Sequence, residues 1–136
     1  MLQMGTEIVA EKRTGGYWSG YMCGRDARGR IQIGTPTGRI YPVRPGRYIV
    51  VNSDTDSRDW AALYVSQVYR WSRVGDGVQC THPDDGARSY HIHQVHGEWS
   101  CSCEAFSRWS FCKHIQAYSL IKDRPSLQPI QGRKSA

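Results

Sequence analysis

The sequence predicts an α+β protein with a β-rich N-terminal unit, one connecting helix and a C-terminal module made of a hairpin and a helix. Three patterns lead to this fold class. Residues 1–52 contain short runs of aromatic and β-branched residues separated by turn-forming clusters. Residues 58–73 repeat apolar side chains at helical spacing, and residues 88–122 join an alternating pattern to a cluster of cysteines and a histidine. A chain of 136 residues is long enough for one domain or two very small ones.

The N-terminal unit, residues 1–52, is expected to be a β-meander. Its predicted strands are the runs GYWSGYMC, GRIQIG, GRIYPV and RYIVV, separated by the turn clusters RDARG, TPTG and RPG. Ile31 and Ile33 alternate with polar residues, which is the pattern of a half-buried strand. Pro42 and Pro45 favour an edge position for the third run, because proline cannot donate a ladder hydrogen bond. These strands suit a small sheet or a barrel of SH3-like or OB-like type.

Residues 53–76 are expected to form the connecting segment, with a helix over about 58–73. The acidic stretch NSDTDSRD precedes the helix, and the free N–H groups of a helix N-terminus favour negative charge. Gly75 lies just beyond the expected end, as is common at helix C-termini. The helix carries an apolar stripe that we assign to the core: Trp60, Tyr64, Val68 and Trp71.

The C-terminal module covers residues 77–122. Its expected elements are a strand at 77–82, hairpin strands at 88–95 and 98–101, and a helix over about 112–122. The helix should stop before Pro125, since the residue before a proline disfavours helical geometry. The tail, residues 123–136, has prolines and no periodicity, and it is expected to be flexible.

Composition limits the compartment and the kind of partner. No apolar run has the length of a signal peptide or a membrane span, so an intracellular protein of the cytoplasm, nucleus or nucleoid is expected, with no membrane partner. The net charge is +6, and fourteen of the eighteen basic residues are arginine, which binds phosphate bidentately and stacks on bases. This charge is compatible with nucleic-acid binding, although solubility alone would also explain it.

Four candidate metal ligands lie close together in the sequence: Cys101, Cys103, Cys112 and His114. Three thiolates with one imidazole are a standard donor set for structural zinc. Side chains two residues apart on a strand are separated by about 6 Å or more, so a turn must bring Cys101 and Cys103 together. Cys112 should lie at the start of the following helix and His114 in its first turn. We therefore expect one structural Zn²⁺.

Two other interpretations of these four residues are weaker. A disulfide is disfavoured in a reducing compartment. Cys112 and His114 would suit a pair of nucleophile and base, but Cys101 and Cys103 would then have no role. Because protein side chains fill all four positions of a tetrahedral ion, no position remains for a catalytic water. No enzymatic activity is therefore expected.

The cluster reads CSC, eight residues, CKH, and then an alanine three residues after the histidine. This pattern resembles the SWIM zinc finger. The flanking segments YHIH and GEWS are similar to the hairpin of such fingers, and Phe106 matches the aromatic residue after the second cysteine. The resemblance covers about residues 88–122 and implies a ββα zinc module that binds DNA or protein. Such fingers occur in transposases, chromatin remodellers, helicase-associated proteins and recombination mediators, so the resemblance alone does not fix the function.

The residues between the ligand pairs are the first candidates for binding a partner. Arg108, Trp109 and Lys113 place an aromatic ring among cations, which suits base stacking with phosphate contact. The expected function is therefore that of a zinc-binding accessory protein for nucleic acid, DNA rather than RNA, in recombination, transposition or repair. The alternative is an adaptor whose finger docks a protein such as a recombinase or an ATPase, without nucleic-acid contact.

A second candidate face for nucleic acid lies in the N-terminal unit. It contains Arg28, Arg30 and Arg39, interleaved with tyrosines and a tryptophan. Solvent-facing arginines on a sheet packed by tyrosines would explain the same residues without any ligand.

Two further groups of residues leave alternatives open. His91 and His93 are expected to share one face of a strand, as a second metal pair, a nucleic-acid contact or ordinary surface. Cys23 and Cys80 suit small core residues, and a second metal site formed by them with His82 is the weaker alternative.

Overall fold

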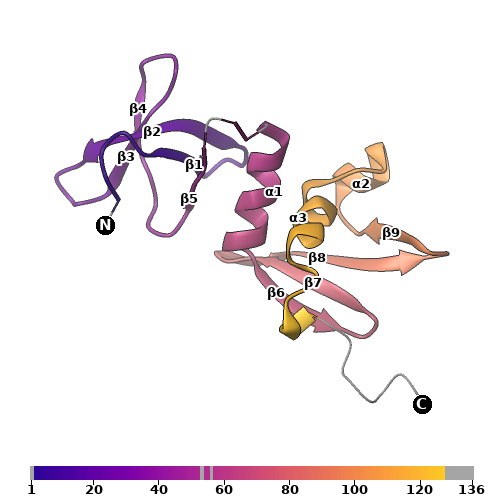
Figure 1. Cartoon of the computed structure of the whole chain (residues 1–136). Helices are drawn as coiled ribbons and strands as arrows, with labels where there is room; N and C mark the ends of the chain where they lie inside the picture. The colour runs from indigo at the N-terminus through magenta and orange to yellow at the C-terminus, as the bar shows by residue number, and fades with distance from the viewer. Residues whose placement is uncertain (1, 53, 56, 128–136) are drawn as a thin grey trace. The chain divides into compact units, whose positions relative to one another are not determined.

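The computed structural model describes residues 2–52, 54–55 and 57–127. In this part of the chain, two antiparallel sheets and three α-helices form an α+β arrangement (Figure 1). The chain divides into two compact units, Met1–Tyr64 and Val65–Ala136. No helix among the described residues is long and apolar enough to cross a membrane.

The first unit contains a five-stranded sheet in the order β4-β3-β2-β1-β5. Each strand is antiparallel to its neighbours, and β5 returns to pair with β1. Among the described strands β4 and β5 remain unpaired edges, so the sheet is open rather than a closed barrel. The strands are β1 (Glu7–Glu11), β2 (Tyr17–Arg25), β3 (Ile31–Gly34), β4 (Ile40–Pro42) and β5 (Tyr48–Val50).

The meander predicted from the sequence is present, with one strand added. Ile31 and Ile33 are buried while Gln32 between them is half-buried, as the alternation predicts. The edge position predicted from Pro42 is also confirmed, because β4 pairs only with β3. Strand β1 was not predicted, because its run EIVAE has three apolar residues and no aromatic residue. This strand nevertheless lies between β2 and β5, so it is fully paired and supplies Ile8 and Ala10 to the core.

A buried carboxylate joins the start of α1 (Ser57–Val68) to the first sheet. The Tyr64 hydroxyl donates a hydrogen bond of 2.9 Å to Oε1 of Glu11, and Nη2 of Arg44 lies 3.5 Å from the same oxygen. Burial and then the charge of Glu11 raise the pKa of Tyr64 above its usual value. Tyr64 therefore remains a hydrogen-bond donor to the Glu11 carboxylate, and a buried charge held in this way has the partners that it requires.

The connecting helix is shorter than the sequence predicts. The expected span of about 58–73 ends at Val68, and Arg70–Val74 form strand β6 instead. In β6 the odd residues are half-buried and the even ones exposed, and β6 pairs with β7 around a turn in which Gly75 has φ 61°. Trp71 fits the helical period as well as the strand period, because it also lies seven residues, or two helical turns, after Tyr64. Residues 70–74 form a strand because they pair with β7. The sequence pattern of residues 58–73 alone gives no information about this pairing.

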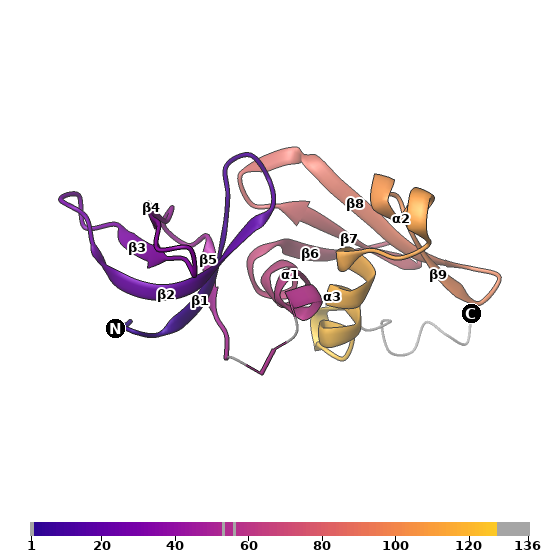
Figure 2. The ribbon, with the colours of Figure 1, turned by 90° about the horizontal axis from the view of Figure 1, so that it is seen from above.

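The second unit contains a four-stranded sheet in the order β6-β7-β8-β9. One face of the sheet supplies Val78, Cys80, Ile92 and Cys101 to the interior. In Figure 2, α3 is seen beside the strands of this sheet. The elements after β6 are β7 (Gly77–His82), β8 (Asp85–Val95), β9 (Glu98–Cys101), α2 (Glu104–Trp109), α3 (Lys113–Ile121) and the 3₁₀ turn η1 (Pro125–Leu127).

The predicted hairpin and last helix are confirmed, and two features differ from expectation. The short helix α2 was not predicted, since six residues are too few to show a helical period. The tail was expected to be flexible from residue 123, yet Leu127 is buried in the core beside Ile121. Residues 128–136 of that tail lie outside the described residues.

A close approach of two strands makes Gly20 sensitive to substitution. A Cβ at Gly20 would overlap the carbonyl oxygen of Gly34 on β3 and lie 2.9 Å from its carbonyl carbon. We expect Gly20→Ala to lower the free energy of unfolding by about 1–3 kcal/mol, the usual range for overpacking. Gly34→Ala is the matched control, because its Cβ would meet Cys23 at an ordinary 3.6 Å. Urea unfolding of the full chain measures both, and equal effects would contradict the prediction.

Candidate metal centre

The end of β9 brings the first two cysteines together. Cys101 is the last residue of β9, and Ser102 and Cys103 turn away from the strand direction. Two hydrogen bonds hold this turn to β8: the Ser102 amide donates to the His91 carbonyl at 3.0 Å, and the His91 amide donates to the Ser102 hydroxyl at 2.9 Å. The turn expected from the Cys-x-Cys spacing is therefore present and is tied to the neighbouring strand.

Two of the cysteines are also helix N-caps. Cys103 precedes α2 and Cys112 precedes α3, both with extended backbone geometry. Their sulfur atoms accept backbone N–H groups of Phe106 and Ile115, each at 3.4 Å. An N-cap normally accepts such a bond through an oxygen, and the helix N-terminus favours a negatively charged group at this place. Each cap thus fixes its sulfur atom and favours the thiolate that a metal ion binds.

His114 lies in the first turn of α3, on the face of the helix that is turned to the core. Ala117 and Ile121 on the same face are buried and Tyr118 is half-buried, as the helical spacing predicts. The His114 ring stacks on Tyr90 with ring centroids 4.1 Å apart and an angle of 29° between the planes. The ring is therefore held in one orientation by the aromatic neighbour on β8.

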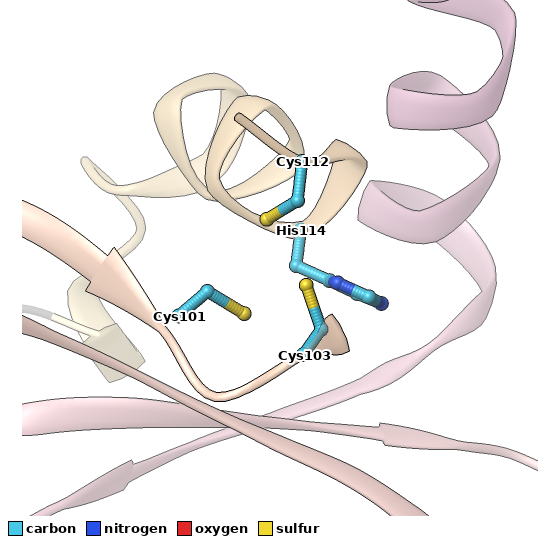
Figure 3. A group of neighbouring side chains, drawn as sticks. All are labelled: Cys101, Cys103, Cys112 and His114. Carbon is cyan, nitrogen blue, oxygen red and sulfur yellow. The ribbon is translucent and has the colours of Figure 1, made fainter. Parts of the chain in front are cut away.

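The four side chains converge on one point. Their candidate ligand atoms all lie within 4.8 Å of one another, and each of the four residues is no more than 5% exposed. Figure 3 shows the three sulfur atoms turned towards one another, with the His114 ring beside Cys103. Neither nitrogen of His114 has a protein partner of hydrogen-bond geometry, and leaving such a group buried costs about 1–3 kcal/mol. The arrangement can hold a metal ion, which would supply the missing partner.

The three thiols differ in the direction in which their surroundings shift the pKa. The thiol of Cys101, followed by the imidazole of His114 and the Ile115 amide, lowers the pKa of Cys112 to about 4, against the opposing effect of burial. The hydrogen bond between the two thiol groups, and then burial, raise the pKa of Cys101 above its usual value. Burial also raises the pKa of Cys103. A bound cation would reverse the last two effects, because its charge favours thiolates.

The residues between the ligand pairs form an exposed surface beside the centre. Trp109 ends α2 with 71% of its surface exposed, and Phe111 is 50% exposed. Arg108 is exposed and pairs with Glu104 at 3.0 Å, one helical turn away. Lys113 is half-buried at the start of α3. The structure therefore brings together the predicted residues Arg108, Trp109 and Lys113.

Tyr90 was not identified as a site residue from the sequence, and Phe111 was included only as part of the segment between the ligand pairs. With Trp109 and Lys113 they line a pocket of about 620 Å³ whose floor includes Cys103, Cys112 and His114. Phe111 had a detectable signal, since it is an aromatic residue directly before a ligand. Tyr90 had none, because its contact with His114 joins positions 24 residues apart in the sequence.

The three arginines proposed in the first unit do not form one cluster. Arg28 lies in the β2–β3 turn and Arg39 in the β3–β4 turn, which are at opposite ends of β3. Arg30 is held by Asp26, with Nε 2.7 Å from Oδ2. The first unit thus offers separate exposed cations at Arg28 and Arg39 and a neutralised one at Arg30.

Cys23 and Cys80 have ordinary structural surroundings, whereas His91 Nε2 and His93 Nδ1 are buried without a hydrogen-bond partner. His91 and His93 share a strand face as predicted, and their rings stack at 4.9 Å. Cys80 is fully buried, and burial raises its pKa to about 12, so this thiol is inert at neutral pH. Cys23 belongs to the first unit, where its thiol donates to the Gln32 carbonyl at 3.6 Å. Cys23 and Cys80 thus have the packing role expected of small apolar residues.

Comparison of the chain with protein-family models, curated proteins and solved structures gives no match.

We expect the purified chain to contain about one metal ion held by the four residues. Cys103→Ser should abolish metal binding and lower the free energy of unfolding of the second unit by about 3 kcal/mol or more, since loss of a structural metal is among the most destabilising changes. Elemental analysis and urea unfolding measure the two effects. Cys23→Ser is the matched control, because Cys23 lies outside the cluster and should leave the metal content unchanged. Equal metal content in both variants would contradict the assignment of Cys103.

Proposed function

We propose that this chain is a zinc-binding accessory protein that binds nucleic acid through the residues between its two ligand pairs. The observation that carries the proposal is the exposure of Trp109 and Phe111 next to the cations Arg108 and Lys113. An aromatic ring that is largely exposed gains nothing from the core, whereas beside cations it can stack on a base while they bind phosphate. The proposed ligand is DNA rather than RNA, as in the SWIM fingers that the sequence resembles.

Zinc is the metal that fits the donor set best. Three thiolates and one imidazole are soft to borderline ligands, which select zinc over magnesium or calcium. Four protein ligands complete a tetrahedral ion, so the proposed role of zinc is structural and the proposal includes no catalytic step. The SWIM resemblance of residues 88–122 supports the same metal and role. Recombination, transposition and repair are the processes in which such accessory proteins are proposed to act.

A second candidate function is that of a protein adaptor. The observation that favours it is the apolar character of Trp109 and Phe111, since aromatic side chains are also enriched at the centre of protein interfaces. A recombinase or an ATPase would be the partner in this case. The two functions differ in their dependence on charge, because displacement of counterions makes nucleic-acid binding weaken steeply with salt.

We expect elemental analysis of the purified chain to find zinc as the bound metal, at about one ion per chain. Removal with a chelator should unfold the second unit, because three of the seven residues of its buried core cluster are metal ligands. Circular dichroism before and after chelation, and again after zinc is restored, measures this effect. A fold that is unchanged in chelator, or a different metal in elemental analysis, would contradict the proposed role of zinc.

We expect micromolar or tighter binding to DNA oligonucleotides at low salt, with affinity falling as salt rises. Glu104→Gln should increase this affinity, because it removes a negative charge and releases Arg108 from its ion pair. Arg108→Ala and Lys113→Ala should decrease it. Fluorescence anisotropy over a series of salt concentrations measures all four proteins.

The control for this experiment is Arg124→Ala, which removes an exposed cation of the same unit that does not line the pocket. It should weaken binding less than Lys113→Ala does. Binding that is independent of salt and unaffected by Glu104→Gln would favour the adaptor, and no binding to DNA at low salt would refute the nucleic-acid proposal.

A further inference from the structure

We propose that the pocket beside the metal centre receives an unpaired nucleobase, so that the protein binds single-stranded nucleic acid in preference to duplex. This inference rests on the proposed nucleic-acid function and adds the form of the ligand. It depends on the shape and lining of the pocket, whereas the proposed function depends on the exposed aromatic residues and the cations.

The pocket has the size and composition of a ligand site. Its volume is about 620 Å³, within the range of about 300–1,000 Å³ that is usual for small-ligand sites. Its floor is formed by residues of the metal centre and by Tyr90, which stacks on His114. Its walls come from α2, from the segment after it and from the start of α3. Since Cys103, Cys112 and His114 are buried, this side of the pocket is fixed wherever the metal centre is formed.

The backbone at Ser110 places two aromatic side chains around this pocket. Ser110 has the left-handed conformation, with φ 56°, and its amide donates to the Phe106 carbonyl at 2.8 Å. This turn ends α2 and separates Trp109 from Phe111, and both residues line the pocket. A non-glycine residue adopts this conformation rarely, so the turn is held by the structure on either side of it. The result is a concave site with exposed aromatic side chains in its walls.

Such a site suits a base that is free of its pairing partner. The faces of bases in a duplex are covered by stacking within the helix, and only their edges are open in the grooves. In a single strand each base can leave the stack and place its flat face on an aromatic ring. Trp109 and Phe111 supply such rings, and Tyr90 supplies a third at the floor.

The charges around the pocket suit the phosphate backbone of the nucleic acid to which the bound base would belong. Lys113 lines the pocket, and Arg108 lies on α2 directly before Trp109. The acidic residue of the lining is Glu104, whose charge Arg108 already balances at 3.0 Å. A phosphate next to the bound base would therefore meet Lys113 and could draw Arg108 away from Glu104, since guanidinium binds phosphate bidentately. These charges favour a nucleic acid over an apolar peptide as the occupant.

The test compares three labelled ligands of the same length with the full, metal-loaded chain. They are a thymidine oligonucleotide, a DNA duplex and an abasic strand that keeps the phosphates but lacks bases. We expect the single strand to bind about tenfold or more tightly than the other two at equal salt, because stacking of one base changes affinity by roughly 5- to 150-fold. Fluorescence anisotropy measures each affinity.

Matched variants locate the effect in the pocket. Trp109→Ala should remove the preference for the single strand, and Trp109→Phe should retain most of it. Leu120→Ala is the control, because Leu120 is an exposed apolar residue of α3 that does not line the pocket. Unchanged metal content and circular dichroism confirm that each variant is folded, as expected for exposed positions.

The outcomes separate the inference from the proposed function. Equal affinity for the three ligands, or a preference that survives Trp109→Ala, would overturn the base pocket and leave general nucleic-acid binding intact. No binding to any of the three ligands would overturn both proposals. A single-strand preference that Trp109→Ala alone removes would establish the base pocket.

Discussion

The second unit depends on the meeting of three thiols and one imidazole in its interior. Cys101, Cys103 and Cys112 are three of the seven residues in its buried apolar cluster, so the metal centre and the core are largely the same structure. A core this small stabilises a fold poorly without a further link. The His114 ring is buried without a hydrogen-bond partner, which is costly unless a cation binds it. The donor geometry and the needs of the core therefore point to the same metal ion.

The meeting of the four ligands also explains why residues 104–111, between the ligand pairs, can present exposed side chains. Helix α2 has six residues and none of them is buried, and a helix of that length is not stable alone in water. Its ends are fixed instead, by Cys103 at its N-cap and by Cys112 at the start of α3. Because the ligands hold the segment, its side chains are not required for packing. Trp109 and Phe111 can thus remain exposed.

Local patterns predicted the parts of the fold that local interactions determine. The ligand set, the hairpin and the stripe on α3 follow from spacing over a few residues, and all three are present. Three of the failures involve distant partners. Residues 70–74 form a strand because they pair with β7. Leu127 is buried because it packs in the core cluster of the second unit. The stacking of Tyr90 on His114 could not be predicted for the same reason, since no short-range pattern joins the two positions.

Position rather than number decides which of the many arginines could bind a ligand. The two units have the same excess of basic residues, with nine basic and six acidic side chains in each. In the first unit Arg28 and Arg39 lie at opposite ends of β3, and Arg30 is held by Asp26. Beside the metal centre there are fewer cations, but they adjoin exposed rings and a pocket. At physiological salt, interactions between exposed charges more than about 8 Å apart are largely screened. A cation next to a stacked base acts at contact distance instead. Nucleic-acid binding is therefore expected where cations and aromatic rings meet, and net charge adds little to this expectation.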